Sequence, residues 1–116
     1  MPQQVSSVLN LPAPYLEMVL SILRKLAPQA EVWAYGSRVT GTGHEASDLD
    51  LIVRNPNDLN AECLGFSALK NAFVESNLPI HVDVMDWARI PAAFRKEIER
   101  EYVVVQGGMK EKAKGL

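Results

Sequence analysis

Three aspartates stand within runs of apolar residues, and they are the first sign of chemistry in this chain. Asp48 and Asp50 are separated by one residue in the run DLDLIV, so on a strand both side chains emerge from the same face. Two carboxylates that close repel each other unless a cation lies between them, and Mg²⁺ prefers oxygen ligands of this kind. Asp83 lies in the middle of the run IHVDVM, where an unpaired charge is costly to bury. The three carboxylates are therefore candidate catalytic and metal-binding groups.

Each of these carboxylates also has an ordinary structural explanation. An isolated Asp-x-Asp pair often lies exposed at a strand end or caps a turn. His81, on the same face of its strand as Asp83, could pair with that carboxylate, or the whole face could be exposed to solvent. The choice between these explanations depends on what surrounds the aspartates.

A glycine and a serine precede the aspartates at a fixed spacing. Gly36 and Ser37 directly follow a predicted strand, and ten residues separate Ser37 from Asp48. A glycine at a strand end lets the backbone approach a phosphate closely, and the amide and hydroxyl of the next residue can donate to phosphate oxygens. Arg38 could bind a phosphate through its planar guanidinium, or face solvent and pair with Glu45. Without the aspartates, Gly-Ser after a strand is more often an ordinary turn.

Helices and strands must alternate along the chain to position these residues. Apolar residues recur at helical spacing from Pro14 onward, and Ala27 and Pro28 end that helix. The loop over residues 36–47 is rich in glycine, serine and threonine. The other expected elements are strands at 31–35, 48–53 and 80–85, helices at about 59–76 and from Pro91 onward, and a short β-branched run at 103–105. This order predicts an α+β fold in which helices pack against one sheet.

The length and composition indicate one globular domain. The 116 residues fit a single domain, with residues 1–13 as a loose N-terminal arm and residues 107–116 as a frayed tail. The formal net charge of −2 provides no general basic field for nucleic acid or an anionic membrane. One cysteine, no signal peptide and no apolar run of membrane-spanning length predict a cytoplasmic protein without an internal disulfide.

Several other polar and aromatic residues have weaker claims to a functional role. His44 and Glu45 are expected to be polar loop residues, although they could lie at the edge of a nucleotide pocket. Asp86 is expected to cap the turn after the third strand. Trp33 and Trp87 are expected to pack in the core rather than to stack on a base.

The stretch from Ala34 to Leu51, AYGSRVTGTGHEASDLDL, resembles the Gly-Ser-x10-Asp-x-Asp signature of the DNA polymerase beta-like nucleotidyltransferases. The element order from about Tyr15 to Gln106 and the third carboxylate, Asp83, are similar to that family as well. In its short length the chain resembles the minimal nucleotidyltransferase branch of that family. This resemblance implies the family's fold, a small mixed sheet with helices packed against it, and ATP as the substrate.

The resemblance also implies a role for each motif residue. The implied nucleotide-binding residues are Gly36, Ser37 and, provisionally, Arg38, and the implied catalytic and metal-binding residues are Asp48, Asp50 and Asp83. Two Mg²⁺ ions, for which Mn²⁺ could substitute, would lie between these carboxylates and the triphosphate. Asp83 would bind the catalytic ion and help to accept the proton of the attacking hydroxyl during in-line attack on the α-phosphorus.

The resemblance further implies a protein acceptor, in particular a tyrosine of a cognate HEPN-type toxin, which would make this chain an antitoxin. Larger relatives that modify aminoglycosides or extend RNA carry an additional helical domain, for which 116 residues leave no room. The alternative is a non-catalytic subunit that neutralises its partner by contact. The intact set of three carboxylates counts against it, because a degenerate site is expected to lose an acidic ligand. Both interpretations require a partner protein, and a homo- or hetero-oligomer fits either.

Overall fold

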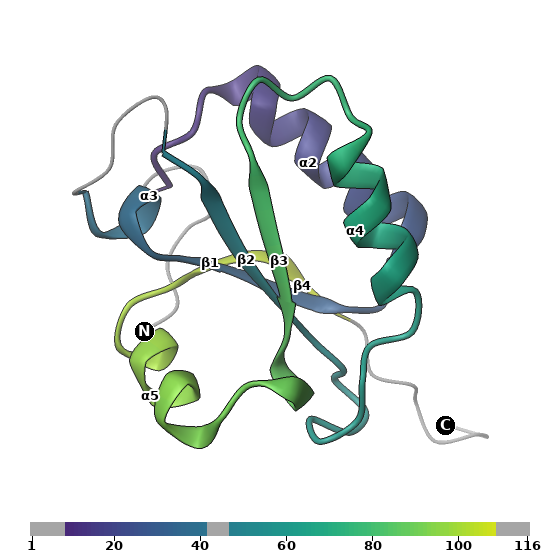
Figure 1. Ribbon diagram of the computed structural model, residues 1–116, viewed down its shortest axis with the longest axis vertical. Coiled ribbons are helices and arrows are strands. Elements are labelled where there is room, and N and C mark those ends of the chain that lie inside the picture. Colours follow the sequence, from purple (N-terminus) through teal and green to yellow (C-terminus); the bar gives the residue numbers. More distant parts are fainter. Residues whose placement is uncertain (1–8, 42–46, 109–116) are drawn as a thin grey trace.

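The computed structural model describes residues 9–41 and 47–108, which form one four-stranded sheet with helices on both faces (Figure 1). The elements in chain order are α2 (Ala13–Leu26), β1 (Glu31–Tyr35), α3 (Ser37–Thr40), β2 (Leu49–Arg54), α4 (Phe66–Val74), β3 (Val82–Asp86), the 3-10 helix η1 (Trp87–Arg89), α5 (Ala92–Arg100) and β4 (Val103–Gly107). The predicted α+β class, with a small mixed sheet and helices against it, is confirmed.

The order of the strands in the sheet is β3-β2-β1-β4. β1 pairs antiparallel with β2 and with β4, whereas β2 and β3 run parallel. Two parallel neighbours need a long crossover between them, and α4 lies in that connection. The strands that carry the predicted aspartates are therefore adjacent, with β2 in the interior of the sheet.

Side-chain alternation along the strands creates a hydrophobic core on each face of the sheet. One face lies against α2 and α4, and Val32, Leu51 and Val84 point into that core. The other face lies against α5, and its core contains Trp33 and Ile52. Figure 1 shows α2 and α4 together on one side of the sheet and α5 on the other. Burial of each large apolar side chain contributes about 1.5–3 kcal/mol, so both layers hold the sheet in place.

The helix expected from Pro14 onward is confirmed as α2. It begins one residue earlier, and proline fits this first turn because the amide that it lacks has no partner inside the helix. Leu16, Val19 and Leu23 are buried against the sheet, and their spacing places them on one side of the helix.

The helix predicted for about residues 59–76 is shorter in the structure, because α4 begins only at Phe66. Gly65 precedes it with a φ of 81°, a left-handed conformation that other residues rarely adopt. A Cβ at Gly65 would lie 2.9 Å from the carbonyl oxygen of Leu26, so a larger residue would also clash. The prediction was wrong because Gly65 begins this helix and does not lie within it.

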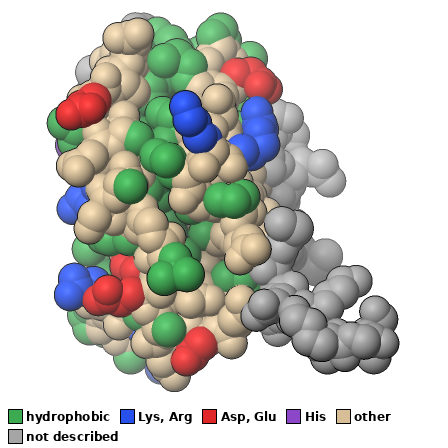
Figure 2. Space-filling view, turned by 90° about the vertical axis from the view of Figure 1, so that its right-hand side faces the viewer, with side chains coloured by type: hydrophobic (Ala, Val, Ile, Leu, Met, Phe, Trp, Pro, Cys, Tyr) green, Lys and Arg blue, Asp and Glu red, His purple; other side chains and the backbone are tan. Residues whose placement is uncertain are grey.

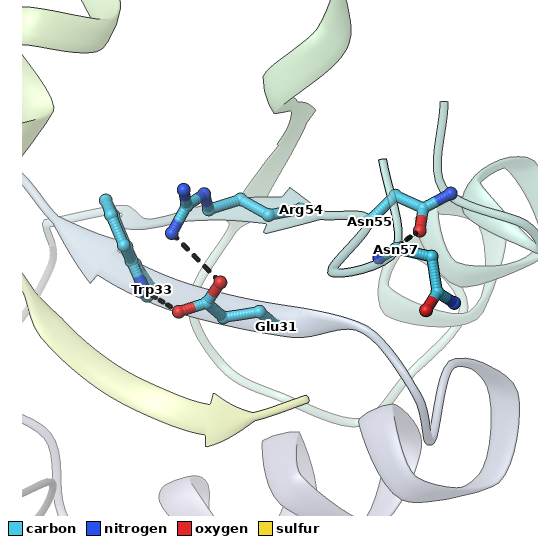
Figure 3. A network of polar contacts seen from close by, with 5 residues as sticks. All are labelled: Glu31, Trp33, Arg54, Asn55 and Asn57. Carbon is cyan, nitrogen blue, oxygen red and sulfur yellow. Dashed lines mark hydrogen bonds and ion pairs between the residues drawn. The ribbon is translucent and has the colours of Figure 1, made fainter. Parts of the chain in front are cut away.

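An ion pair joins β1 and β2 at the end of the sheet that lies away from the aspartates (Figure 3). Nη1 of Arg54 and Nε1 of Trp33 each donate to the carboxylate of Glu31 at 2.9 Å. The Arg54 guanidinium carbon lies 4.0 Å from the ring centroid of Trp33 and 4.5 Å from that of Trp87. Tyr102 stacks on Trp33 with a centroid distance of 3.9 Å. Both tryptophans are buried packing groups, as predicted.

The described structure includes residues that were predicted to belong to a loose N-terminal arm and a frayed C-terminal tail. Leu9 is buried, and the amide of Asn10 donates to the carbonyl of Arg38 at 2.8 Å, although the arm was expected to extend to residue 13. At the other end, β4 includes Gly107, where the tail was expected to begin. Residues 1–8 and 109–116 lie outside the described part. Within the ranges 9–41 and 47–108, no helix has the length and hydrophobicity needed to cross a membrane. The cytoplasmic location stays a prediction.

Candidate active site

Three side chains form a row across one face of the sheet. Tyr35, the last residue of β1, is the register partner of Asp50 on β2. Asp50 is in turn the register partner of Asp83 on β3. Register partners on neighbouring strands point to the same face, with backbones about 4.8 Å apart. The structure therefore brings two of the three predicted aspartates together, and we call Tyr35, Asp50 and Asp83 the aspartate row.

The third predicted aspartate lies at the edge of this row. Asp48 comes immediately before β2 and is exposed to solvent, whereas Asp50 and Asp83 are half-buried. Its charge is close enough to contribute to the raised pKa of Asp50.

The row places like charges close together. Burial raises the pKa of Asp50 to about 6, with further contributions from the charges of Asp83 and Asp48 and an opposing contribution from His81. Burial and the charges of Asp50 and Asp83 also raise the pKa of Tyr35 to about 12. Within the described ranges, none of the three aspartates forms an ion pair. The alternative in which His81 pairs with Asp83 is therefore not seen there.

The donor set suits a hard divalent cation, although it is not a closed cage. Among residues 9–41 and 47–108, no group of three or more His, Cys, Asp or Glu side chains is close enough to hold a metal ion. Mg²⁺ commonly takes only one or two carboxylates and completes its octahedron with water and substrate phosphate oxygens. Because Asp50 and Asp83 are adjacent, repel each other and offer only oxygen, they fit an ion that binds together with a phosphate.

Gly36 lies directly against the centre of the aspartate row. It follows β1 with a φ of 83° and a ψ of −157°, a combination that essentially only glycine adopts. A Cβ at this position would lie 2.5 Å from Oδ2 of Asp50. The sequence indicated a turn here, but it contained no sign of the contact between the turn and the carboxylate.

A single helical turn, α3, begins immediately after Gly36, where the sequence predicted only loop. The amides of Val39 and Thr40 donate to the carbonyl of Gly36 at 2.9 and 3.0 Å. Gly41 ends the turn in a left-handed conformation with a φ of 86°. Ser37 is the half-buried first residue of α3, and the first amides of any helix lack partners inside it. The prediction of a continuous loop was wrong. The helical segment lies between two glycines and is too short to show a helical periodicity in the sequence.

Arg38 is a buried structural residue and not a solvent-facing one. Its side chain is 2% exposed. Nε donates to the carbonyl of Ser47 at 3.0 Å, and Nη1 donates to the carbonyl of Asn10 at 2.7 Å. The solvent-facing alternative is therefore wrong, and such deep burial leaves little of the guanidinium accessible to a phosphate. The expected partner Glu45 and its neighbour His44 lie outside the described residues.

A cavity of about 300 Å³ opens beside the aspartate row. The lining residues come from β1, α3 and α5 and from the residues that flank them: Tyr35, Gly36, Thr40, Phe94, Glu97, Ile98, Arg100 and Glu101. The rings of Tyr35 and Phe94 meet edge to face with centroids 5.8 Å apart. The sequence identified Phe94 and Ile98 only as one side of a helix. No sequence signal places that helix on the same sheet face as the aspartates.

Asp86 has the structural role that the sequence predicted for it. Its Oδ1 accepts a hydrogen bond from the amide of Ala88 at 3.1 Å, which caps η1. Its Oδ2 accepts one from the amide of Cys63 at 2.9 Å. The residue is 2% exposed and points to the opposite face of β3 from Asp83.

Comparisons with known proteins agree with this geometry. Residues 16–106 match the family described as nucleotidyltransferase domain. A probable protein adenylyltransferase MntA of Haemophilus influenzae is 43% identical over 98 residues, which cover 84% of each chain. A crystal structure described as a toxin-antitoxin with AMP-PNP is similar with a TM-score of 0.62 and 21% identity, over 81% of this chain and 74% of that one. At that identity the structural match shows a common fold. The matched range 16–106 contains every residue of the aspartate row.

Proposed function

The chain belongs to the nucleotidyltransferase family and is a nucleotidyltransferase, and we propose that it transfers AMP from ATP to a hydroxyl group of a partner protein. The observation that carries this proposal is the register pairing of Asp50 with Asp83 beside the Gly36 turn. Carboxylates for a metal ion and a close backbone turn for phosphates are the two parts that nucleotidyl transfer needs. The name of the MntA relative supports adenylyl transfer to a protein.

The aspartates would hold two Mg²⁺ ions, Asp48 and Asp50 contacting both and Asp83 contacting the one nearer the acceptor. When bound, such ions lower the pKa of the attacking hydroxyl and neutralise the pyrophosphate that leaves. Burial is the main cause of the raised pKa of Asp50, and the charges of Asp83 and Asp48 add to it. A divalent cation would offset the repulsion between these charges, which supports this assignment. Asp83 would also help to accept the proton of the attacking hydroxyl.

Gly36 and Ser37 would hold the triphosphate. The absence of a side chain at Gly36 lets an oxygen-rich ligand approach the backbone beside Asp50. The Ser37 hydroxyl and amide, at the first position of α3, can donate to phosphate oxygens. Arg38 supports this turn through its hydrogen bonds to the carbonyls of Asn10 and Ser47, and its burial argues against a direct contact with a phosphate.

We assign the acceptor to a tyrosine of a HEPN-type toxin, so that modification of the toxin makes this chain an antitoxin. The similar structure described as a toxin-antitoxin supports a toxin as the partner, and the HEPN type and the tyrosine follow from the family resemblance. Two exposed apolar side chains, Leu64 at 88% and Val74 at 74%, lie at and near α4 and offer a contact area. Figure 2 shows the side of the molecule that carries α2 and α4, where apolar side chains reach the surface between charged ones.

A contact-only antitoxin is the second candidate. One observation favours it, namely that the described residues do not already hold three acidic ligands around one point. The register pairing of Asp50 with Asp83 favours the enzyme. The two candidates differ in whether ATP binding and neutralisation of the toxin depend on these aspartates.

The test is calorimetric titration of ATP with and without Mg²⁺, followed by transfer of labelled AMP to the co-expressed partner. Asp48→Asn and Asp50→Asn are expected to abolish metal-dependent transfer. Glu17→Gln, which removes an exposed carboxylate on α2, is the control and should behave as the unmodified protein. Transfer that persists in both aspartate variants would exclude the two-metal scheme. Neutralisation of the partner without transfer would favour the contact-only antitoxin.

A further inference from the structure

The cavity beside the aspartate row adjoins both parts of the proposed nucleotide site. It shares Gly36 with the proposed phosphate turn and Tyr35 with the aspartate row. A base lies one ribose away from the α-phosphate. Two other cavities among the described residues, of about 310 and 320 Å³, lie beyond the opposite ends of the strands. The first is lined by residues 26–30, 55–57 and 63–65, and the second by residues 62–68 and Arg89. They lie on the order of 15 Å away, one strand length, and a ribose does not span that distance.

The floor of this cavity is apolar and aromatic. Ile98 is 2% exposed, and Phe94 and Tyr35 are half-buried. The two rings are inclined at 81° to each other, so they form a corner in which a flat ligand can stack on one ring and touch the edge of the other. Nucleobases bind aromatic side chains in this manner.

The rim of the cavity is polar and carries more negative than positive charge. Glu97 and Glu101 line it together with Arg100, whose guanidinium lies 3.7 Å from the Glu97 carboxylate. These three side chains are exposed. Two carboxylates against one guanidinium disfavour a phosphate group here, whereas a carboxylate accepts readily from the amino group of a base.

We propose that this cavity is the nucleobase pocket, in which a base with an exocyclic amino group stacks on Phe94 and donates to Glu97 or Glu101. The proposal rests on the proposed function, since it requires a nucleotide bound at Gly36 and Ser37. It assigns selection of the base to α5, an element that contributes neither a metal ligand nor a phosphate contact. Adenine fits this pocket through its 6-amino group, and hypoxanthine, which has an oxo group there, does not.

The test compares three ligands in calorimetric titrations with Mg²⁺ present: ATP, inosine triphosphate and inorganic tripolyphosphate. The variants are Phe94→Ala, Phe94→Leu, Glu97→Gln and Glu101→Gln, and the control is Phe66→Ala, which removes a half-buried ring on α4 at the opposite sheet face. Phe94→Leu keeps the apolar volume of the floor if Phe94→Ala proves unstable. Both carboxylates are exposed, so their replacement by glutamine leaves the fold intact.

We expect Phe94→Ala to weaken ATP binding about tenfold, because base stacking on an aromatic ring is lost. Phe94→Leu should weaken it less, and Phe66→Ala should not change it. Tripolyphosphate should bind all variants equally. The unmodified protein should prefer ATP to inosine triphosphate, and at least one of the two glutamine variants should lose that preference.

Several results would overturn the proposal. If both Phe94 variants bind ATP with unchanged affinity, the base does not bind in this cavity. The proposed function would still hold. If those variants bind ATP normally but transfer AMP poorly to the partner, the cavity belongs to the acceptor. If the unmodified protein binds ATP and inosine triphosphate with equal affinity, Glu97 and Glu101 do not select the base. If neither ATP nor tripolyphosphate binds, the proposed function fails together with the pocket.

Discussion

Gly36 and Asp50 lie so close that a methyl group added to the Gly36 Cα would be 2.5 Å from Oδ2 of the carboxylate. The glycine thus has two requirements at once, a positive φ and empty space on the side of the aspartate row. Gly41, at the other end of α3, has only the first, because it also has a positive φ but nothing within 4 Å of an added Cβ. Gly41 is therefore a control for the positive φ, and the extended ψ of Gly36 adds a further restriction at that position.

We expect Gly36→Ala to lower the free energy of unfolding by about 2–3 kcal/mol, since it combines backbone strain with a clash, and to abolish binding of Mg²⁺ and ATP. Gly41→Ala is expected to cost only about 1–2 kcal/mol and to keep binding. Urea unfolding and calorimetry of both variants provide the measurement. Equal effects of the two substitutions would show that the contact with Asp50 does not matter.

The raised pKa of Asp50 predicts a pH dependence of stability in the absence of metal. Because the pKa is near 6 in the folded chain and near 3.8 when the carboxyl is exposed, the folded state binds more protons between these values. Stability from this group is then greatest below pH 3.8 and is lost as the pH rises through 6. The Asp50→Asn side chain does not ionise, so the variant does not lose this stability as the pH rises. We expect it to be more stable than the unmodified protein at pH 7.5 in EDTA by at most about 1 kcal/mol, since the site is partly solvated.

The measurement is urea unfolding at pH 4.5 and pH 7.5, with EDTA and then with Mg²⁺. Added Mg²⁺ should raise the stability of the unmodified protein at pH 7.5 and leave Asp50→Asn almost unchanged. Parallel pH profiles of the two proteins would argue against a raised pKa of Asp50 in the folded chain.

The buried guanidinium of Arg38 predicts a large loss of stability on substitution. Arg38→Gln removes the guanidinium that donates to the carbonyls of Asn10 and Ser47 and introduces a shorter side chain into a buried space. We expect a decrease of about 2–4 kcal/mol in the free energy of unfolding. Arg24→Gln, at an exposed position of α2, should change it by less than about 0.5 kcal/mol. Thermal unfolding distinguishes them, and a stable Arg38→Gln protein would contradict the structural role.

Asp83 and Asp86 are three residues apart on β3 and should behave in opposite ways when each is changed to asparagine. Asp86→Asn places an amide against two backbone amide donors and should cost about 1–3 kcal/mol of stability, with ATP binding retained wherever the protein is folded. Asp83→Asn removes one of two repelling carboxylates, so its stability should be retained while transfer is lost. Loss of transfer in both variants at equal stability would show that the two faces of β3 are not independent.

Local patterns in the sequence account for much of this fold. The helical spacing of Leu16, Val19 and Leu23 predicted α2, and alternation predicted β3 with Asp83 on one face and Val82 and Val84 on the other. The spacing between Ser37 and Asp48 resembles a family signature, and that resemblance implied a shared site. These features depend on residues close together in the chain, which is why periodicity and spacing suffice for them.

The missed features depend on contacts between distant segments. Burial of Arg38 requires Asn10, which lies 28 residues earlier. The aromatic corner requires Tyr35 of β1 and Phe94 of α5 to meet, and neither residue marks that contact in the sequence. The late start of α4 depends on the approach of Gly65 to the end of α2. Tertiary packing decided each of these, and local patterns carry no information about it.

The pairing of β1 with β4 has a consequence for the synthesis of this protein. Gln106 donates to the carbonyl of Ala30 at 2.8 Å across 76 residues, next to the register pair of Glu31 and Gly107. On the ribosome, the first strand of the sheet therefore emerges long before its last partner. Until then β1 has one open edge, and Trp33 lacks the ring of Tyr102. Such edges promote association between unfinished chains, so nascent copies growing side by side on one messenger RNA are most exposed to one another during this interval.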